Sequence, residues 1–390
     1  MKYDFDEETS RLGSGSVKWD IAHDAQVLPM WVADMDFKAA PAIQKAVEER
    51  AKQGIFGYTM VKPSYYEAII NWFANRHGWH IQPDWILYTT GVVPAIGCAI
   101  KALCQPGERV IIQSPVYNSF FPSIRNQGCE VVENALLRKG DTYVIDFEDF
   151  ARKCADPLVT AFLLCNPHNP AGRVWTKAEL EQLNDICERH GVRIISDEIH
   201  CELIMPGQHF TPFGTINSKA TILNSPTKNF NIAGLQIANI ICPDAETRRR
   251  IDRVRHIYEL RDLNPFGPIA LEAAYNDSGD WLEELNQYLF ENYNALCEHF
   301  RKALPQCTPL RLEGTYLVWL DISTLGLTSD EATALLLEKG KVMVNSGTMY
   351  GPQTGQGYLR INIACQRKRM MEGLERITDT LAAYLSGKQK

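Results

Sequence analysis

Six short apolar segments, separated by helical or turn patterns, lie between residues 85 and 245. In chain order they are RVIIQS, CEVVENAL, TAFLLCN, VRIISDE, ATILNS and ANIIC. Segments this apolar are typical of strands that are covered on both faces, as in parallel sheets with crossover helices. Residues 177–190 carry the periodic pattern of such a helix, after a Thr176–Glu179 capping box and before Gly191. The sequence therefore predicts an α/β fold with a mostly parallel sheet between helices.

The pattern changes near residue 281. A long amphipathic stretch, WLEELNQYLFENYNALCEHFRKAL, precedes the strand-like segment TYLVWLDI, a helix near SDEATALLLEKG, the segment YLRINIAC and a final helix. We expect three parts: an N-terminal segment (1–45) that packs with the small domain, a large domain (46–280), and a smaller α+β C-terminal domain (281–390). A length of 390 residues agrees with a two-domain organisation.

Composition argues against several classes of partner. The net charge of −7 does not favour binding of the whole chain to nucleic acid or to an anionic membrane. The start of the chain lacks a signal-peptide pattern and no apolar run is long enough for a bilayer, so we expect a cytoplasmic protein. Cys187 and His190 have metal-ligand spacing, but no second pair follows, and we predict no metal site.

Polar side chains follow several of the predicted strands. Asp197 ends one strand, Asn169 follows a second, and Ser225 ends a third, three residues before Lys228. Ligands of parallel α/β sheets bind at the carboxyl ends of the strands, so these side chains are candidates for one site. The stretch NSPTKNFNIAGLQ, which contains Lys228, has no acidic residue that would keep the lysine charged. A lysine can act as a base or nucleophile only after it loses its proton.

A second group of residues suits a phosphorylated aromatic ligand. Gly91 begins a turn into a helix with Pro94 near its start, and the free N–H groups of Val92 and Val93 could bind phosphate. Tyr117 follows another strand and offers a ring for stacking. Pyridoxal phosphate needs these features together with a lysine for its Schiff base and an anion beside its ring nitrogen.

The motifs resemble those of a known family. NPHNPAGRVW, SDEIH, SPTKNFNIAGLQ and YLRINIA match, in order and spacing, the fold-type I pyridoxal phosphate enzymes of the aminotransferase class I/II superfamily. More narrowly, PMWVADMDF, FGYT, SPVYNSFF and SDEIHCEL resemble the MalY/PatB subfamily of cystathionine β-lyases, or C–S lyases. The resemblance covers essentially the whole chain and implies pyridoxal 5′-phosphate as the cofactor.

The resemblance also implies a role for individual residues. Lys228 would bond to the cofactor and shuttle protons, and Asp197 would pair with the ring nitrogen. Asn169 would donate a hydrogen bond to the phenolic oxygen of the cofactor, and Tyr117 would stack on its ring. The cofactor phosphate would be bound by Val92, Val93, Ser225 and Thr227. Turn formation remains the alternative for Asn169 and for the hydroxyl pair, and core packing for Tyr117.

Two further residues match positions that bind substrate. Arg360 would hold the substrate α-carboxylate, because a planar guanidinium suits a carboxylate. Tyr58 would reach into the site of a neighbouring subunit, which implies a homodimer with shared active sites. A surface ion pair is the alternative for Arg360, and an ordinary buried tyrosine is the alternative for Tyr58.

The chain departs from many aminotransferases at two positions. His200 stands where they have tyrosine, and it either contacts the cofactor oxygen or fills space. Gln236 stands where they have an arginine that binds phosphate, which leaves the expected phosphate site one positive charge short. His200 agrees with the lyase subfamily, whereas Gln236 weakens a strict transfer of the phosphate ligands.

The expected reaction is α,β-elimination of an amino-acid thioether. Cystathionine would yield homocysteine, and cysteine would yield sulfide, each with pyruvate and ammonia. An aminotransferase is the first alternative, because it uses the same lysine and shares every step up to removal of the Cα proton. A cofactor-fold protein retained for regulation or binding is the second alternative, although such a protein would not need Lys228, Asp197 and Arg360 together.

Overall fold

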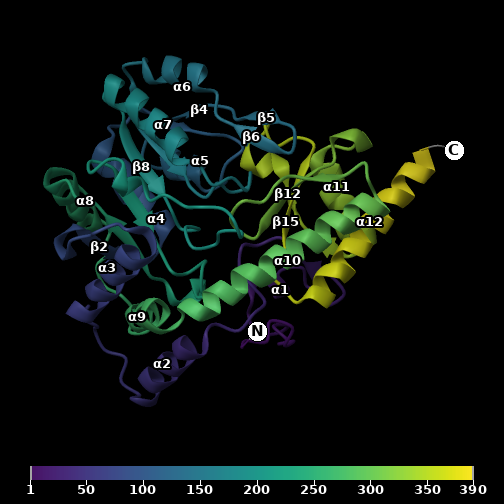
Figure 1. Cartoon of the computed structure of the whole chain (residues 1–390), viewed down its shortest axis with the longest axis horizontal. Coiled ribbons are helices and arrows are strands. Elements are labelled where there is room, and N and C mark those ends of the chain that lie inside the picture. Colours follow the sequence, from purple (N-terminus) through teal and green to yellow (C-terminus); the bar gives the residue numbers. More distant parts are fainter. Residues whose placement is uncertain (1, 389–390) are drawn as a thin grey trace.

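The computed structural model describes residues 2–388, and a seven-stranded sheet forms its centre (Figure 1). The strand order is β2-β10-β9-β8-β7-β3-β4. The five strands from β9 to β4 pair in parallel, whereas β10 is antiparallel to both of its neighbours, β9 and the edge strand β2. The strands are β2 (Ile86–Thr89), β3 (Arg109–Ile112), β4 (Glu130–Glu133), β7 (Val159–Cys165), β8 (Arg193–Asp197), β9 (Thr221–Asn224) and β10 (Ala238–Ile241).

The six strands predicted from apolar segments are confirmed, and five of them are mostly buried as expected, whereas the edge strand β4 is only partly buried. Along β7, Phe162 and Leu164 pack into one hydrophobic core, while Ala161 and Leu163 pack into the other. Sequence reasoning missed β2, a four-residue strand whose two central side chains are only partly buried. Its apolar signal is therefore too short and too mixed to stand out.

Helices cover both faces of the sheet. They are α2 (Pro41–Lys52), α3 (Pro63–His77), α4 (Val92–Leu103), α5 (Phe120–Arg125), α6 (Phe147–Cys154), α7 (Lys177–His190), α8 (Ala245–Ile257) and α9 (Gly267–Asp277). The predicted capping box of α7 is confirmed, because Thr176 and Glu179 exchange side-chain and backbone hydrogen bonds. Gly191 ends this helix in the left-handed conformation with φ 70°.

The C-terminal part forms a second, antiparallel sheet beside the first (Figure 1). Its order is β11-β12-β15-β14, with strands β11 (Thr308–Pro309), β12 (Leu317–Asp321), β14 (Asn345–Ser346) and β15 (Tyr358–Asn362). Its helices are α10 (Gly279–Ala303), α11 (Ser329–Leu335) and α12 (Arg367–Lys388). The predicted α/β fold with a smaller α+β C-terminal part is confirmed.

Shorter elements connect these layers. A hairpin is formed by β5 (Leu137–Lys139) and β6 (Thr142–Val144), and a short helix α1 (Val17–Asp20) lies near the N-terminus. Near the N-terminus, β1 (Leu28–Pro29) pairs in parallel with β13 (Val342–Met343) of the C-terminal part. Single turns of 3-10 helix occur at Pro83–Trp85, Phe213–Thr215, Ala233–Leu235, Ser323–Leu325 and Gly347–Tyr350, and a π-helical turn at Leu336–Gly340.

Residues 2–388 contain neither a candidate membrane span nor a candidate metal-binding cluster. No helix in this part of the chain is long and apolar enough to cross a lipid bilayer. No group of three or more His, Cys, Asp or Glu side chains within it is arranged to hold a metal ion. Cys187 is buried whereas His190, at the end of α7, is exposed.

Candidate active site

The carboxyl ends of β7, β8 and β9 meet at one edge of the central sheet because these strands are parallel. A pocket of about 210 Å³ lies at this edge. Most of the predicted site residues line it together: Val92, Val93, Tyr117, Asn169, Asp197, His200, Thr227 and Lys228. The structure therefore brings together side chains that are up to 136 residues apart in sequence (Val92 and Lys228).

Lys228 follows β9 and points into this pocket, where it remains partly accessible. Its Nζ donates a hydrogen bond of 2.6 Å to the main-chain oxygen of Ala33. The pKa of Lys228 is lowered to about 8, because burial, together with the charge of Arg360, outweighs the opposing charges of Asp34 and Asp197. Among residues 2–388, no carboxylate lies within ion-pair distance of this amine. A substantial fraction of the lysine is therefore uncharged at slightly alkaline pH.

Asp197 is the last residue of β8 and is only 3% exposed. Its Oδ1 accepts a hydrogen bond of 3.2 Å from the Ile199 N–H. Burial raises the pKa of Asp197 to about 7, and the Lys228 charge only partly offsets this effect. A cation next to the carboxylate would favour its charged form. The protonated nitrogen of a pyridine ring is such a cation.

His200 lies in the turn after β8 and is 4% exposed. Burial lowers the pKa of His200 to about 3, and the charges of Lys228 and Arg360 contribute in the same direction. The ring is therefore neutral at physiological pH. Its Nδ1 is buried and has no hydrogen-bond partner in the described residues. This unpartnered nitrogen favours contact with a ligand over simple space filling.

The end of the pocket that could bind an anion is the start of α4. Because this helix begins at Val92, the N–H groups of its first turn have no carbonyl within the helix to bind. Thr227 also lines this pocket, but Ser225 lies behind it and is fully buried. The Ser225 hydroxyl donates to the Ile237 oxygen at 2.6 Å and accepts from the Thr227 N–H at 3.1 Å. In this chain Ser225 therefore supports Thr227, while Gln236 is exposed and does not line the pocket.

Arg360 lies on β15 of the second sheet and is 3% exposed. Its Nη1 donates to Asn169 Oδ1 at 3.1 Å, its Nη2 donates to the Trp31 oxygen at 2.8 Å, and its Nε has no partner. The guanidinium also lies over the ring of Tyr350, 4.8 Å from its centroid. No carboxylate of residues 2–388 forms an ion pair with Arg360, so the alternative of a surface ion pair is wrong. A buried cation without a counter-charge could bind an anionic ligand.

Tyr58 lies outside the pocket and is fully exposed, so the alternative of a buried tyrosine is wrong. Its apolar neighbours Ile55, Phe56 and Met60 are also exposed, by 75%, 58% and 83%. The structure of one chain therefore does not bring Tyr58 to the other site residues. Its predicted place in a neighbouring subunit stays a prediction.

Sequence reasoning missed the two main-chain oxygens that hold the cationic side chains. They belong to Trp31 and Ala33 in the segment PMWVADMDF. The acidic and aromatic character of this segment was visible, but a main-chain carbonyl carries no side-chain signal. The pocket walls formed by Cys165, Ile199 and Ala233 were missed as well, because apolar side chains in and after strands carry no signal that separates a pocket wall from ordinary core or loop.

Comparison with known proteins places this pocket in a family. Residues 26–377 match the family model described as aminotransferase class I and II. The chain belongs to this family. The resemblance inferred from the motifs is thus confirmed, and the family match spans both sheets.

Individual members of the family are similar over nearly the whole length. The chain is 42% identical to cystathionine β-lyase PatB of Bacillus subtilis (strain 168), over 97% of this chain and 100% of the relative. It is 32% identical to protein MalY of Escherichia coli (strain K12), over 98% and 99%. The crystal structure of cystalysin from Treponema denticola, which contains pyridoxal 5′-phosphate, superimposes with a TM-score of 0.95 at 35% identity, over 98% and 100%. Within the family, the chain groups with the PatB and MalY proteins.

The pocket of this chain fits pyridoxal phosphate. The start of α4 and Thr227 can receive the phosphate, and the Asp197 carboxylate can face the ring nitrogen. The Lys228 amine, with its lowered pKa, can attack the aldehyde. Tyr117, which also lines the pocket, supplies a flat face for the ring.

Proposed function

We propose that this chain is a pyridoxal-phosphate-dependent C–S lyase that cleaves cystathionine or related cysteine S-conjugates by α,β-elimination. The substrate and one water become a thiol, pyruvate and ammonia. Pyridoxal 5′-phosphate is the cofactor, as in cystalysin, and when bound it accepts the electron pair left at Cα. Cystathionine is the substrate in the name of the Bacillus subtilis relative.

The observation that carries this proposal is the buried, unpaired guanidinium of Arg360 in contact with Asn169. An amino acid brings an α-carboxylate, which supplies the missing counter-charge at Arg360. The unpartnered Nε leaves one edge of the guanidinium free for this carboxylate. Two parallel hydrogen bonds would fix both the position and the rotation of the substrate about Cα.

Lys228 then performs the proton transfers. Once the substrate amino group replaces it on the cofactor, its free amine takes the Cα proton. A pKa of about 8 lets this amine accept a proton and later return it at physiological pH. The C–S bond at Cβ breaks, the thiolate leaves with the electron pair, and a proton from Lys228 or water converts it to the thiol. Asp197 keeps the ring nitrogen protonated throughout, and the neutral His200 offers Nδ1 for a hydrogen bond.

We extend the proposal to a homodimer with shared active sites. The exposed apolar side chains of Ile55, Phe56, Tyr58 and Met60 lie on one loop, which a second copy of the chain would cover. The Tyr58 side chain is fully exposed and does not line the pocket of its own chain. In the dimer, it would complete the substrate side of the neighbouring pocket.

The reaction is tested with a large excess of cystathionine and no added keto acid. A lyase releases pyruvate and thiol over many turnovers, because elimination returns the cofactor to its aldehyde form. An aminotransferase stops after one half-reaction per site and resumes when a keto acid is added. Absence of both reactions with cystathionine, cysteine and S-methylcysteine would contradict the proposal and favour a regulatory or binding role.

A further inference from the structure

One segment of the main chain holds both cationic side chains of the pocket. Residues 31–36 form an arch whose Trp31 oxygen accepts a hydrogen bond from Arg360 Nη2 at 2.8 Å. Two residues on, the Ala33 oxygen accepts from Lys228 Nζ at 2.6 Å. Ala33 itself lines the pocket. The orientation of the lysine and of the guanidinium therefore depends on where this arch lies.

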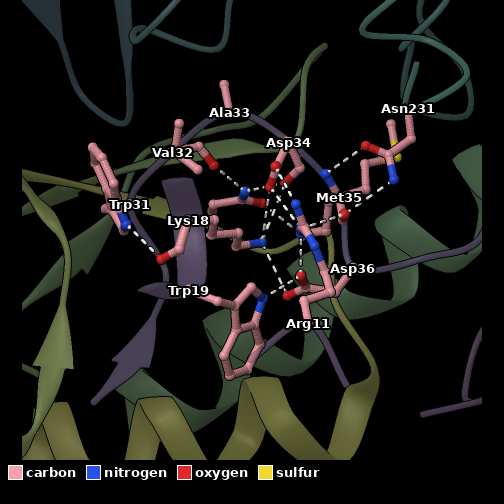
Figure 2. Close-up of polar contacts among 12 residues, drawn as sticks. Arg11, Lys18, Trp19, Trp31, Val32, Ala33, Asp34, Met35, Asp36 and Asn231 are labelled. Atoms are coloured by element: carbon pink, nitrogen blue, oxygen red, sulfur yellow. Dashed lines mark hydrogen bonds and ion pairs between the residues drawn. The ribbon is translucent and has the colours of Figure 1, made fainter. Parts of the chain in front are cut away.

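Side chains next to the two cations tie down the same arch. Asn362, two residues beyond Arg360 on β15, donates from Nδ2 to the oxygens of Val32 and Asp34 at 2.6 and 2.7 Å. Asn231, three residues beyond Lys228, accepts from the Met35 N–H at 3.0 Å and donates to the Met35 oxygen at 3.0 Å. Figure 2 shows the arch passing over these contacts. Its geometry is thus fixed relative to both catalytic segments.

Below the arch lies a cluster of paired charges (Figure 2). The Asp36 carboxylate, 3% exposed, accepts hydrogen bonds from Lys18 Nζ at 3.0 Å, Arg11 Nη1 at 2.9 Å and Trp19 Nε1 at 2.8 Å. Arg11 also binds both oxygens of Asp34, at 3.1 and 2.7 Å. Lys18, 2% exposed, donates to the Asp34 main-chain oxygen at 3.2 Å. These contacts fix the end of the arch in position.

We propose that Asp36, with Lys18 and Arg11, is a positioning residue for the reaction. The cluster holds the arch so that the Ala33 and Trp31 oxygens orient Lys228 and Arg360. None of the three cluster residues lines the pocket, so they act only through the arch. This inference goes beyond the proposed function in the role it gives these residues, and it rests on that function only for its kinetic test.

The alternatives are that the cluster only stabilises the N-terminal segment, or that it acts on Lys228 only through its charge. Charge and position are separable, because Asp36→Asn removes a negative charge whereas Lys18→Met removes a positive one. An electrostatic effect alone would shift the pKa of the Lys228–cofactor linkage in opposite directions in the two variants. Displacement of the arch would instead move the Ala33 oxygen away from Lys228 in both variants. Because this acceptor favours the protonated form, its loss lowers the pKa in both variants.

The experiment titrates the visible absorbance of the holoenzyme with pH, for wild type, Asp36→Asn and Lys18→Met. We expect the pH midpoint of this titration to be lower in both variants than in wild type. We also expect kcat/KM for cystathionine to fall by about tenfold or more and KM to rise. The titratable and charged groups facing Lys228 are Asp34, Asp197, His200 and Arg360, and all four are unchanged in every variant. The absorbance readout needs only cofactor attachment, so it stands even if wild type proves not to be a lyase.

Asp149→Asn is the matched control. The Asp149 carboxylate on α6 also binds one lysine, one arginine and one neutral N–H group, those of Lys153 and Arg152 on the same helix and of Asn134 after β4, and none of these residues lines the pocket. This variant should lose some thermal stability while its absorbance midpoint and KM stay those of wild type. If Asp36→Asn and Lys18→Met also keep the wild-type absorbance midpoint and KM, the proposal is overturned. Midpoints that move in opposite directions in these two variants would overturn it as well.

Arg11→Gln covers the case in which a buried variant does not fold. Arg11 has a side chain that is 26% exposed, so its removal is the mildest change in the cluster. It removes a positive charge, and an electrostatic effect alone would therefore raise the midpoint. We expect a lowered midpoint and a raised KM, both smaller in size than in Lys18→Met. A midpoint that is unchanged or raised would contradict the positioning role.

Discussion

Lys18 and Lys228 are both lysines whose amines lie inside the protein, and only one of them has acidic partners. Lys18 Nζ lies 3.0 Å from Asp36 and 3.6 Å from Asp34. Lys228 Nζ has a carbonyl partner instead, and burial lowers its pKa to about 8. The comparison indicates that this chain pairs the charges that hold structure. It leaves without a carboxylate partner the two basic side chains, Lys228 and Arg360, that the proposed function assigns to cofactor and substrate.

The largest effect expected from this comparison is that of Lys228→Ala. Removing the amine removes the covalent link to the cofactor and the base for the Cα proton, so turnover and the visible absorbance of the link should vanish. The folded state should lose little stability, because no carboxylate loses a partner. Cofactor can still bind through its phosphate, which equilibrium dialysis would measure. Lyase activity near the wild-type level would contradict the assignment of Lys228.

Lys18→Met is the structural counterpart of that variant. It leaves the buried Asp36 with fewer partners, and we expect the free energy of unfolding to fall by on the order of 3 kcal/mol. Chemical denaturation of the cofactor-free proteins would compare the two variants directly. Equal losses of stability in Lys18→Met and Lys228→Ala would break the distinction between paired and unpaired lysines.

Arg360→Lys should have the next largest effect. Lysine keeps the positive charge but loses the planar pair of donors, so the substrate carboxylate is bound without fixed rotation. We expect Arg360→Lys to lose roughly 2–4 kcal/mol of transition-state stabilisation, which is measured as a lower kcat/KM for cystathionine. KM should rise as well. Arg109→Lys is the control, because Arg109 forms its ion pairs with Glu130 and Asp156 at the opposite end of β3. Steady-state kinetics in which both variants behave alike would argue against a carboxylate site at Arg360.

Tyr58 tests whether the pocket of one chain is complete. Tyr58→Ala and Lys228→Ala subunits should each form inactive or weakly active dimers. Mixed dimers carry one pocket with both native residues, so activity should reappear after subunit exchange. Differently tagged subunits would show that exchange occurred. Exchange without recovered activity would contradict a shared site.

The apolar strands and the positions of Asp197, Asn169 and Lys228 could be predicted, because strand periodicity and strand-end chemistry are written in side chains. The short strand β2 could not, since four residues with two partly buried side chains give no clear period. Ser225 illustrates a subtler limit. Its hydroxyl type is visible in the sequence, but its direction, toward the Ile237 oxygen and behind Thr227, depends on the folded turn.

The arch over the pocket was less predictable than the residues it holds. The oxygens of Trp31 and Ala33 are main-chain atoms, which every residue has. The pairing of Asp36 with Lys18 and Arg11 joins positions up to 25 residues apart in an irregular segment. No helical or strand period relates these positions, so only the tertiary structure shows the contact.

The smallest effect on turnover is expected at two buried carboxyl groups outside the pocket, Glu198 and Glu202, which extend the comparison from cations to acids. Glu202 is paired with Arg76 and His77, and its pKa is lowered because these partners outweigh burial. Glu198 has only neutral donors, the Phe213 N–H and the Ser196 hydroxyl, and burial raises its pKa to about 8. Glu198 is therefore protonated in the folded protein at pH 7, and glutamine is close to it in shape and charge.

The sign of the pH effect follows from these pKa values. Between pH 4.5 and 8 the folded state binds more protons at Glu198 than the unfolded state, so this residue makes stability fall as pH rises. Glu198→Gln removes that dependence. Its free energy of unfolding should lie within about 1 kcal/mol of wild type at pH 5 and gain about 1.4 kcal/mol per pH unit relative to wild type up to pH 8. Glu202→Gln should lose stability at pH 7, because Arg76 loses a charged partner. Urea denaturation of the cofactor-free variants at pH 5, 6, 7 and 8 would measure both, and a Glu198→Gln curve parallel to wild type would show that Glu198 is already ionised in the folded chain.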